Sequence, residues 1–290
     1  MCPTAIEPVE LSAPVPPRPT FDVHVHPWPP RLYRAIESWF GTHAWAIEQG
    51  MPGEEVAAFL AARGVSRHVA MVYAHKAGLA DSLNDWMAAY ARTHPEAVAL
   101  GTVHPADDVR AVARRALDEL GLRGLKLHTH VMGFPPDDPR LFPAYELLAS
   151  RRLPLVVHAG TEPASPAYPR PCHEVSGLAR LVPVLERFPE MPCVVPHLGA
   201  GEYELAAALL ARFAALRLDT AMVLARYFPG APGRDWVLRH HRRIMYGTDF
   251  PILPYDYDRE RRCILDLELG RDVEDALFWR NAVELFGDRR

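Results

Sequence analysis

The chain has 290 residues and a net charge of -4, with 49% hydrophobic and 23% charged residues, as in an ordinary globular protein. The basic residues are scattered, which gives no indication of a nucleic-acid or anionic membrane surface. No apolar run reaches transmembrane length, and the N-terminus lacks the basic and apolar regions of a signal peptide. The four cysteines form no CxxC pair, so we expect reduced thiols in a cytoplasmic protein.

The sequence divides into a short arm and one long domain. Residues 1–20 contain six prolines and little periodicity, which predicts either an extended arm on the surface or a disordered tail. Residues 21–290 alternate short apolar or β-branched runs with amphipathic segments, the pattern of βαβ units. Strands are expected near 21–26, 67–73, 97–103, 123–128, 154–158, 192–197, 216–220 and 243–248. Helices are expected near 31–40, 53–63, 81–93, 106–120, 139–151, 174–188, 201–214, 234–241, 257–269 and 272–286.

The sequence thus predicts eight strands separated by helices, and eight is the number of strands that closes a parallel barrel. The predicted fold is therefore of the α/β class, a (β/α)8 TIM barrel. No internal repeat, and no low-complexity linker after residue 30, indicates a second unit, so a single domain is expected. An open, doubly wound sheet is the main alternative.

The first predicted strand, Phe21-Asp22-Val23-His24-Val25-His26, ends in two histidines. Side chains alternate along a strand, so His24 and His26 share one face. Asp22 lies on the same face, where we expect it to support a histidine rather than to bind metal. A proline-rich turn follows at once. Two imidazoles at a strand end suit a metal whose other ligands lie far along the chain.

Ionisable residues also stand at the ends of later strands. His128 ends the fourth strand, His158 the fifth and His197 the sixth, and Asp249 follows the eighth. In a TIM barrel, catalytic groups converge at the C-terminal ends of the strands. The pattern predicts an active site, because core or surface histidines would show no relation to strand ends.

The segments DVHVH, GLKLH, VVHAG, VPHLG and MYGTDFP, in this order, resemble the amidohydrolase superfamily. They are most similar to the amidohydrolase 2 branch, which includes aminocarboxymuconate-semialdehyde decarboxylase, and the resemblance covers residues 20–287. It implies a divalent metal held by His24, His26, His158 and Asp249, with His197 as a catalytic acid/base. Imidazoles and a carboxylate suit Zn²⁺, with Mn²⁺ or Fe²⁺ as alternatives. Asp249 is also expected to take a proton from a metal-activated water.

Further candidates concern substrate binding and a second metal. His128 either lines the pocket or is a packed histidine. Tyr168, Arg170 and His173 fall in a long loop after the fifth strand, which is either an ordinary lid or part of the substrate site, with Arg170 binding a carboxylate. In some superfamily members a lysine on the fourth strand is carbamylated and bridges two metals. Lys126 lies deeper than such a bridge needs, which favours one metal and an ordinary amine.

The leading prediction is a metal-dependent hydrolase that cleaves a small lactone, amide or ester with a metal-activated water. Non-oxidative decarboxylation of a small aromatic or unsaturated acid is the alternative, because the same ligands serve both reactions. The lack of an arginine cluster beside Arg170 favours hydrolysis. A non-catalytic metal-binding barrel is a further alternative, although the complete ligand set and His197 speak against it. We expect a small-molecule partner and no nucleic acid or membrane, and the sequence leaves a homodimer open.

Overall fold

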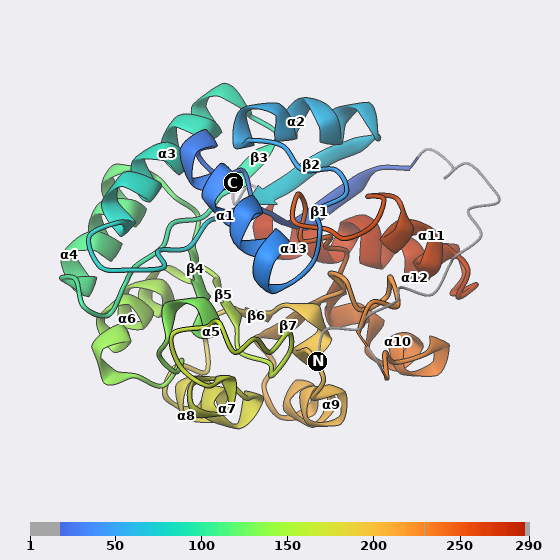
Figure 1. Ribbon diagram of the computed structural model, residues 1–290. Coiled ribbons are helices and arrows are strands. Elements are labelled where there is room, and N and C mark those ends of the chain that lie inside the picture. The colour runs from blue at the N-terminus through green and yellow to red at the C-terminus, as the bar shows by residue number, and fades with distance from the viewer. Residues whose placement is uncertain (1–17, 229, 288–290) are drawn as a thin grey trace.

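The computed structural model describes residues 18–228 and 230–287, in which helices surround a set of parallel strands (Figure 1). The strands are β1 (Thr20–Val25), β2 (Val65–Ala70), β3 (Ala97–Ala99), β4 (Leu125–His128), β5 (Leu155–His158), β6 (Cys193–Val195), β7 (Leu216–Asp219) and β8 (Ile244–Met245). The predicted N-terminal arm lies, up to residue 17, outside the described residues. Within the described part, no helix has the length and apolar character needed to cross a membrane.

Backbone pairing closes these strands into a barrel. Strands β1–β3 form one parallel sheet and β4–β8 form another, each in sequence order. Parallel bridges join Gly101 to Leu125 and Val25 to Phe250, so the two sheets are linked at both edges. The predicted (β/α)8 barrel in a single domain is confirmed.

Strand β8 is shorter than the predicted range 243–248, because side chains take over the hydrogen bonds of the chain that follows it. The backbone N–H of Gly247 donates to Oγ1 of Thr220 at 3.1 Å. The N–H of Thr248 donates to Oδ1 of Asp22, also at 3.1 Å. The chain therefore leaves the regular ladder just before it delivers Asp249 to the barrel end.

The helices follow the predicted order. They are α2 (Gly53–Ala62), α3 (Ala80–Thr93), α4 (Val109–Arg114), α6 (Phe142–Arg151), α8 (Leu178–Arg187), α9 (Tyr203–Arg212), α10 (Arg234–His240), α11 (Arg259–Leu265), α12 (Arg271–Asp275) and α13 (Asn281–Phe286). Two short helices, α5 (Thr129–Met132) and α7 (Cys172–Val175), lie near the barrel end. The single helix predicted at 174–188 is divided into α7 and α8, because Gly177 adopts a φ of 119° between them.

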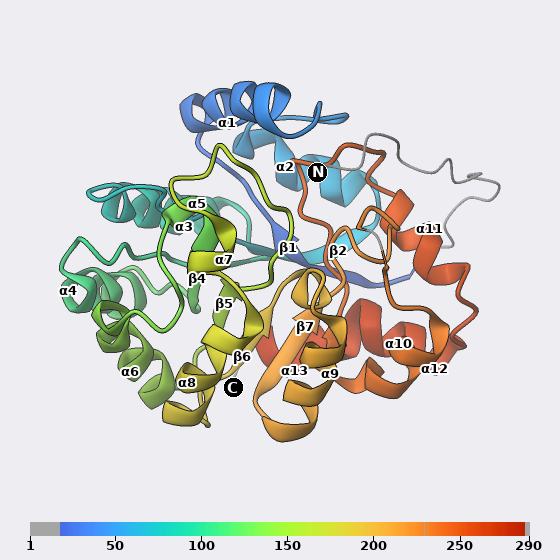
Figure 2. The ribbon, with the colours of Figure 1, turned by 60° about the horizontal axis from the view of Figure 1, so that its bottom comes forward.

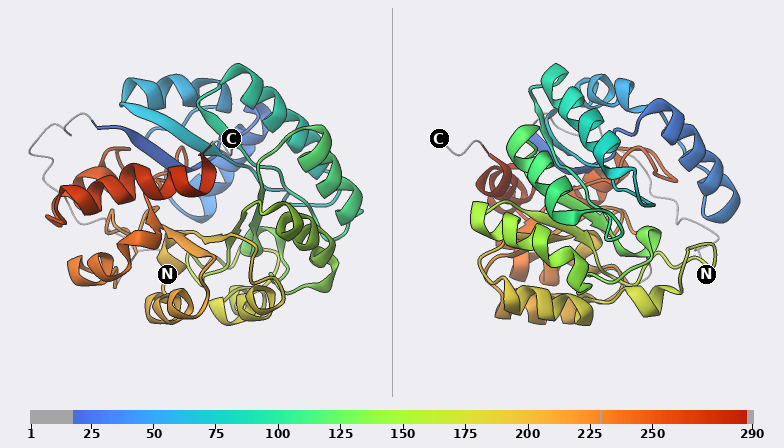
Figure 3. Two further views of the ribbon diagram at one scale, coloured as in Figure 1. Left: turned by 180° about the vertical axis from the view of Figure 1, so that it is seen from behind. Right: turned by 90° about the vertical axis from the view of Figure 1, so that its left-hand side faces the viewer.

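Helix α1 (Pro30–His43) lies across one end of the barrel rather than in the outer ring (Figures 1 and 2). Proline is well suited to its first position, where a backbone N–H would lack a helical partner. Leu32, Ile36, Trp39 and Phe40 recur at helical spacing and line a cavity beneath the helix. Helix α13 lies on the opposite side of the barrel (Figure 3). The apolar face of α1 therefore covers the end at which the polar strand termini meet.

Candidate metal centre and cavity

Strand β1 and the segment after β8 bring three metal-ligand atoms together. The Nε2 atoms of His24 and His26 lie 3.2 Å apart. Oδ1 of Asp249 lies 3.3 Å from the first and 3.0 Å from the second. Ligands bound about 2.0–2.1 Å from a tetrahedral ion are separated by about 3.3 Å. The three residues are buried and form a group that can hold a metal ion.

The outward hydrogen bonds of the two imidazoles fix their tautomers. Nδ1 of His26 donates to the carbonyl oxygen of Met71 at 2.7 Å, since a carbonyl can only accept. Nδ1 of His24 faces Oδ2 of Asp219 at 2.9 Å, and burial lowers the pKa of His24 well below its usual value. A neutral ring that donates through Nδ1 carries a lone pair on Nε2. Electron-rich atoms this close repel unless a cation lies between them, and a divalent metal fits this donor set.

Asp249 completes the group as an ionised carboxylate. Its backbone has a φ of 76°, and that of His197 has a φ of 58°, both in the left-handed region. Such conformations cost on the order of 1 kcal/mol in residues other than glycine and are concentrated at functional sites.

Asp219, at the end of β7, links two of the histidines and is absent from the predicted site. Its Oδ2 accepts the hydrogen bond from His24, and its Oδ1 accepts from the backbone N–H of His197 at 3.0 Å and of Ala221 at 3.2 Å. Burial raises the pKa of Asp219 to about 6. The segment Leu216-Arg217-Leu218-Asp219 carries the same signal as the other strands, namely an ionisable residue at the strand end, so the sequence could have revealed it.

Asp22 supports the site from below, as expected. It accepts hydrogen bonds from the hydroxyl of Thr248 at 2.6 Å, the hydroxyl of Tyr257 at 3.0 Å and the backbone N–H of His24 at 3.0 Å. Burial raises the pKa of Asp22 to about 7. These contacts occupy both carboxylate oxygens and tie β1 to the segment that carries Asp249.

His197 and His158 stand beside the three-residue group. Nδ1 of His197 donates to the carbonyl oxygen of Ala221 at 2.9 Å, and its Nε2 lies 3.9 Å from Oδ2 of Asp249. Nε2 of His158 donates to the carbonyl oxygen of Glu162 at 2.9 Å. Only Nδ1 of His158 is therefore free to bind a metal, and His158 lies outside the group formed by the other three predicted ligands.

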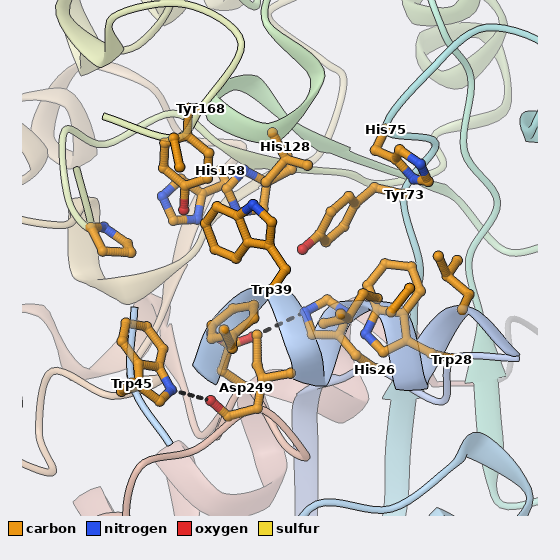
Figure 4. A pocket seen from close by; sticks show the side chains of 18 of the residues that line it. His26, Trp28, Trp39, Trp45, Tyr73, His75, His128, His158, Tyr168 and Asp249 are labelled. Carbon is orange, nitrogen blue, oxygen red and sulfur yellow. Dashed lines mark hydrogen bonds and ion pairs between the residues drawn. The ribbon is translucent and has the colours of Figure 1, made fainter. Parts of the chain in front are cut away.

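A cavity of about 350 Å³ opens over these residues (Figure 4). Its polar end consists of His24, His26, His128, His158, His197 and Asp249. Its apolar wall consists of Leu32, Ala35, Ile36, Trp39 and Phe40 of α1, and of Pro163, Ala167, Tyr168 and Pro169 of the β5–α7 loop. Among the described residues, no lysine or arginine lines the cavity.

Seven aromatic rings form a closed circuit around the polar end. In order they belong to His24, His26, Trp28, Tyr73, His128, His158 and His197, with successive centroids 4.1 to 5.4 Å apart and 5.1 Å between the last and the first. His128 and His158 are register partners on β4 and β5, and their rings stack at 8°. Figure 4 shows Tyr73 between Trp28 and His128.

The predicted substrate residues fall into two groups. His128 and Tyr168 line the cavity. Arg170 is exposed and pairs with Glu174 at 3.0 Å, and His173 lines a separate surface depression, so the structure does not bring either to the cavity. A position in a long loop does not specify the direction of a side chain, which is why the sequence did not separate these pairs.

Lys126 and His130, on and just after β4, lie outside the cavity lining. Lys126 is fully buried, and its Nζ has no hydrogen-bond partner among the described residues. Burial lowers the pKa of Lys126 to about 8, and the residue does not line the cavity. His130 does not continue the strand face on which Lys126 and His128 lie. The strand ends at His128, and His130 lies in α5 with Nε2 against the carbonyl oxygen of Gly160.

Several cavity residues were missed by the sequence reasoning. Trp28 lies in the turn after β1, and Tyr73 and His75 follow β2. Trp39 belongs to α1, in which the helical spacing of apolar residues predicts one apolar face. That spacing alone does not distinguish a helix that faces the core from one that covers a cavity.

Comparisons with known proteins agree with this arrangement. The family model described as amidohydrolase matches residues 21–287. No curated protein sequence matches the chain. A solved TIM-barrel protein of Bordetella bronchiseptica is 19% identical, with a TM-score of 0.67 and coverage of 92% of this chain and 98% of that one.

Two further solved structures share the fold. The 5-carboxyvanillate decarboxylase of Novosphingobium aromaticivorans, with bound manganese, is 17% identical, with a TM-score of 0.68. The match covers 92% of this chain and 97% of that one. A probable 2-pyrone-4,6-dicarboxylic acid hydrolase of Acinetobacter baumannii is 14% identical, with a TM-score of 0.65 and coverage of 93% and 100%. At these identities the likeness shows the fold alone.

Proposed function

We propose that this chain, which belongs to the amidohydrolase family, is a metal-dependent enzyme that removes CO₂ from a small aromatic acid without oxidation. The observation that carries the proposal is the division of the cavity into a polar end and an apolar wall. An aromatic acid has the same division, with one carboxylate and one flat ring. Pockets of this size bury most of a small ligand and orient it through a few polar groups.

The metal would be held by His24, His26 and Asp249, with Nδ1 of His158 as the candidate for a fourth ligand. When bound, a divalent metal supplies a Lewis acid that offsets the charge of a substrate carboxylate. Zinc is our first choice for an imidazole and carboxylate set, and manganese is an alternative, as in the Novosphingobium structure. One metal per chain is proposed, because Lys126 lies beneath the cavity rather than in its lining.

The proposed reaction breaks the bond between the ring carbon and the carboxyl carbon. CO₂ leaves, the electron pair stays on the ring carbon, and that carbon takes up a proton, so neither oxidant nor reductant is needed. We assign the proton to Nε2 of His197, because its Nδ1 is already held by the carbonyl oxygen of Ala221. The carboxylate of Asp249, 3.9 Å away, stabilises the protonated ring of His197 before the transfer.

Hydrolysis, the reaction favoured by the sequence, is the second candidate. The pair formed by His197 and Asp249 could serve as acid and base for an ester or lactone. An amide, ester or lactone carries polar atoms on both sides of its scissile bond, and these need hydrogen-bond partners when buried. The apolar wall offers few such partners, so decarboxylation fits the cavity better.

A panel of aromatic acids labelled with ¹³C in the carboxyl group tests this proposal. Protein loaded with zinc or manganese should release ¹³CO₂, and in D₂O the product should carry deuterium at the vacated ring carbon. The His197→Gln variant should bind the same acids but lose turnover by about 100-fold or more, the usual contribution of a general acid. A parallel panel of aromatic esters and lactones in ¹⁸O-labelled water is the comparison. Turnover of that panel alone, with ¹⁸O in the product carboxylate, would show that hydrolysis is the correct reaction.

A further inference from the structure

The apolar wall of the cavity carries no charge to meet a second anionic group. We infer that the cavity selects aromatic acids with a single carboxylate and rejects those with another carboxylate at the far end of the ring. Helix α1 is the main element that sets this selectivity. The inference rests on the proposed function in one respect: the substrate carboxylate points to the polar end.

The charged residues of α1 are directed away from the cavity. Arg31 and Arg34 are exposed, and neither belongs to the cavity lining, although both lie within one turn of lining residues. The lining positions on α1 are 32, 35, 36, 39 and 40, which form one continuous helical stripe. The helix therefore has cations available but presents only apolar side chains to a bound ring.

The β5–α7 loop repeats this arrangement on the facing side. Tyr168 stacks on Trp39 of α1 with centroids 5.5 Å apart and an interplanar angle of 17°, so the two parts of the wall are in contact. Arg170, two residues further on, pairs with Glu174 at 3.0 Å and lies outside the lining. The cation of this loop is thus paired with an acid of the following helix, α7, and is absent from the wall.

A second carboxylate placed against this wall would be buried without a partner. An ionised carboxylate loses its hydration on burial, and only a paired charge or several hydrogen bonds offset that loss. The wall supplies no charge, and its only polar side-chain groups are the hydroxyl of Tyr168 and the indole N–H of Trp39; outside it and the polar end, His75 is the one further imidazole that the described residues contribute to the lining. The carboxylate at the polar end has neighbouring imidazoles, so the two ends of a symmetric diacid would experience opposite environments.

Two probes with one ring system test the inference: 2-naphthoate and 2,6-naphthalenedicarboxylate. Isothermal titration calorimetry on the zinc-loaded full chain should give an affinity about 100-fold higher for the monoacid, as expected when a charge is buried unpaired. Equal affinities, or binding of neither acid, would overturn the inference. The measurement needs no turnover. Selective binding without CO₂ release would therefore refute only the decarboxylase proposal, whereas CO₂ release with equal affinities would refute only the selectivity.

A charge placed in the wall provides the converse test. Ile36 is partly buried and lines the cavity, so Ile36→Arg introduces a cation facing the ring. Ser38→Arg places the same charge on the exposed side of the same helix and is the matched control. Ile36→Arg should raise the affinity of the diacid at least about 10-fold relative to the monoacid, and Ser38→Arg should leave the ratio unchanged. An unchanged ratio in a folded Ile36→Arg protein, checked by circular dichroism, would contradict the role of α1.

Discussion

Replacing Asp219 by asparagine should weaken metal binding although Asp219 touches no metal. In the native protein Oδ2 accepts from Nδ1 of His24, and Oδ1 accepts from the backbone N–H groups of His197 and Ala221. An asparagine has only one acceptor oxygen. Whichever way its amide is turned, an NH₂ group faces a donor, so either His24 changes tautomer or the chain that carries His197 moves.

The expected loss follows from this geometry. Carboxylates that orient metal-bound histidines typically contribute 10- to 100-fold to metal affinity, or about 1.4–2.8 kcal/mol. We expect Asp219→Asn to fall in that range, measured by competition with a zinc chelator at pH 7.5. Asp235→Asn, whose side chain is highly exposed on α10, serves as the matched control. Unchanged zinc affinity in a folded Asp219→Asn protein would refute the assigned tautomer of His24.

Three further perturbations follow from the same contacts. His24→Ala should abolish stoichiometric zinc binding. The unfolding midpoint should change little, because residues at this end of a barrel serve function more than stability. Zinc bound to this variant at one ion per chain would contradict the ligand assignment. Trp39→Ala should raise KM for an aromatic acid about 10-fold with kcat nearly unchanged, since Trp39 lines the apolar wall, away from the proposed site of bond cleavage. A fall in kcat alone would contradict this role. Burial lowers the pKa of His68 to about 3 in the folded protein. As pH falls from 6.5 towards 3, His68 therefore becomes protonated in the unfolded chain but stays neutral in the folded protein, so the free energy of unfolding should decrease. His68→Leu should make this decrease shallower in urea titrations, and an identical slope would argue against a neutral buried His68.

Much of the fold and of the polar end could be predicted from sequence because both follow periodic rules. Alternation along a strand places His24 and His26 on one face, and the barrel brings strand termini together whatever their separation in the chain. The same rule predicts Asp219, once it is applied to β7.

The apolar wall could not be predicted in this way. Arg170 and Tyr168 are two residues apart in one loop, yet one faces Glu174 and the other faces Trp39. Loops lack a period that would fix these directions. The amphipathic pattern of α1 specifies an apolar face, but only the tertiary structure shows that this face covers a cavity.

The metal centre is the claim on which the rest of the account depends, and anomalous diffraction from crystals of the zinc-loaded protein tests it most directly. One anomalous peak per chain is expected, within bonding distance of Nε2 of His24, Nε2 of His26 and Oδ1 of Asp249. A peak elsewhere in the molecule, or a second peak bridged to the first through a carbamylated Lys126, would contradict it.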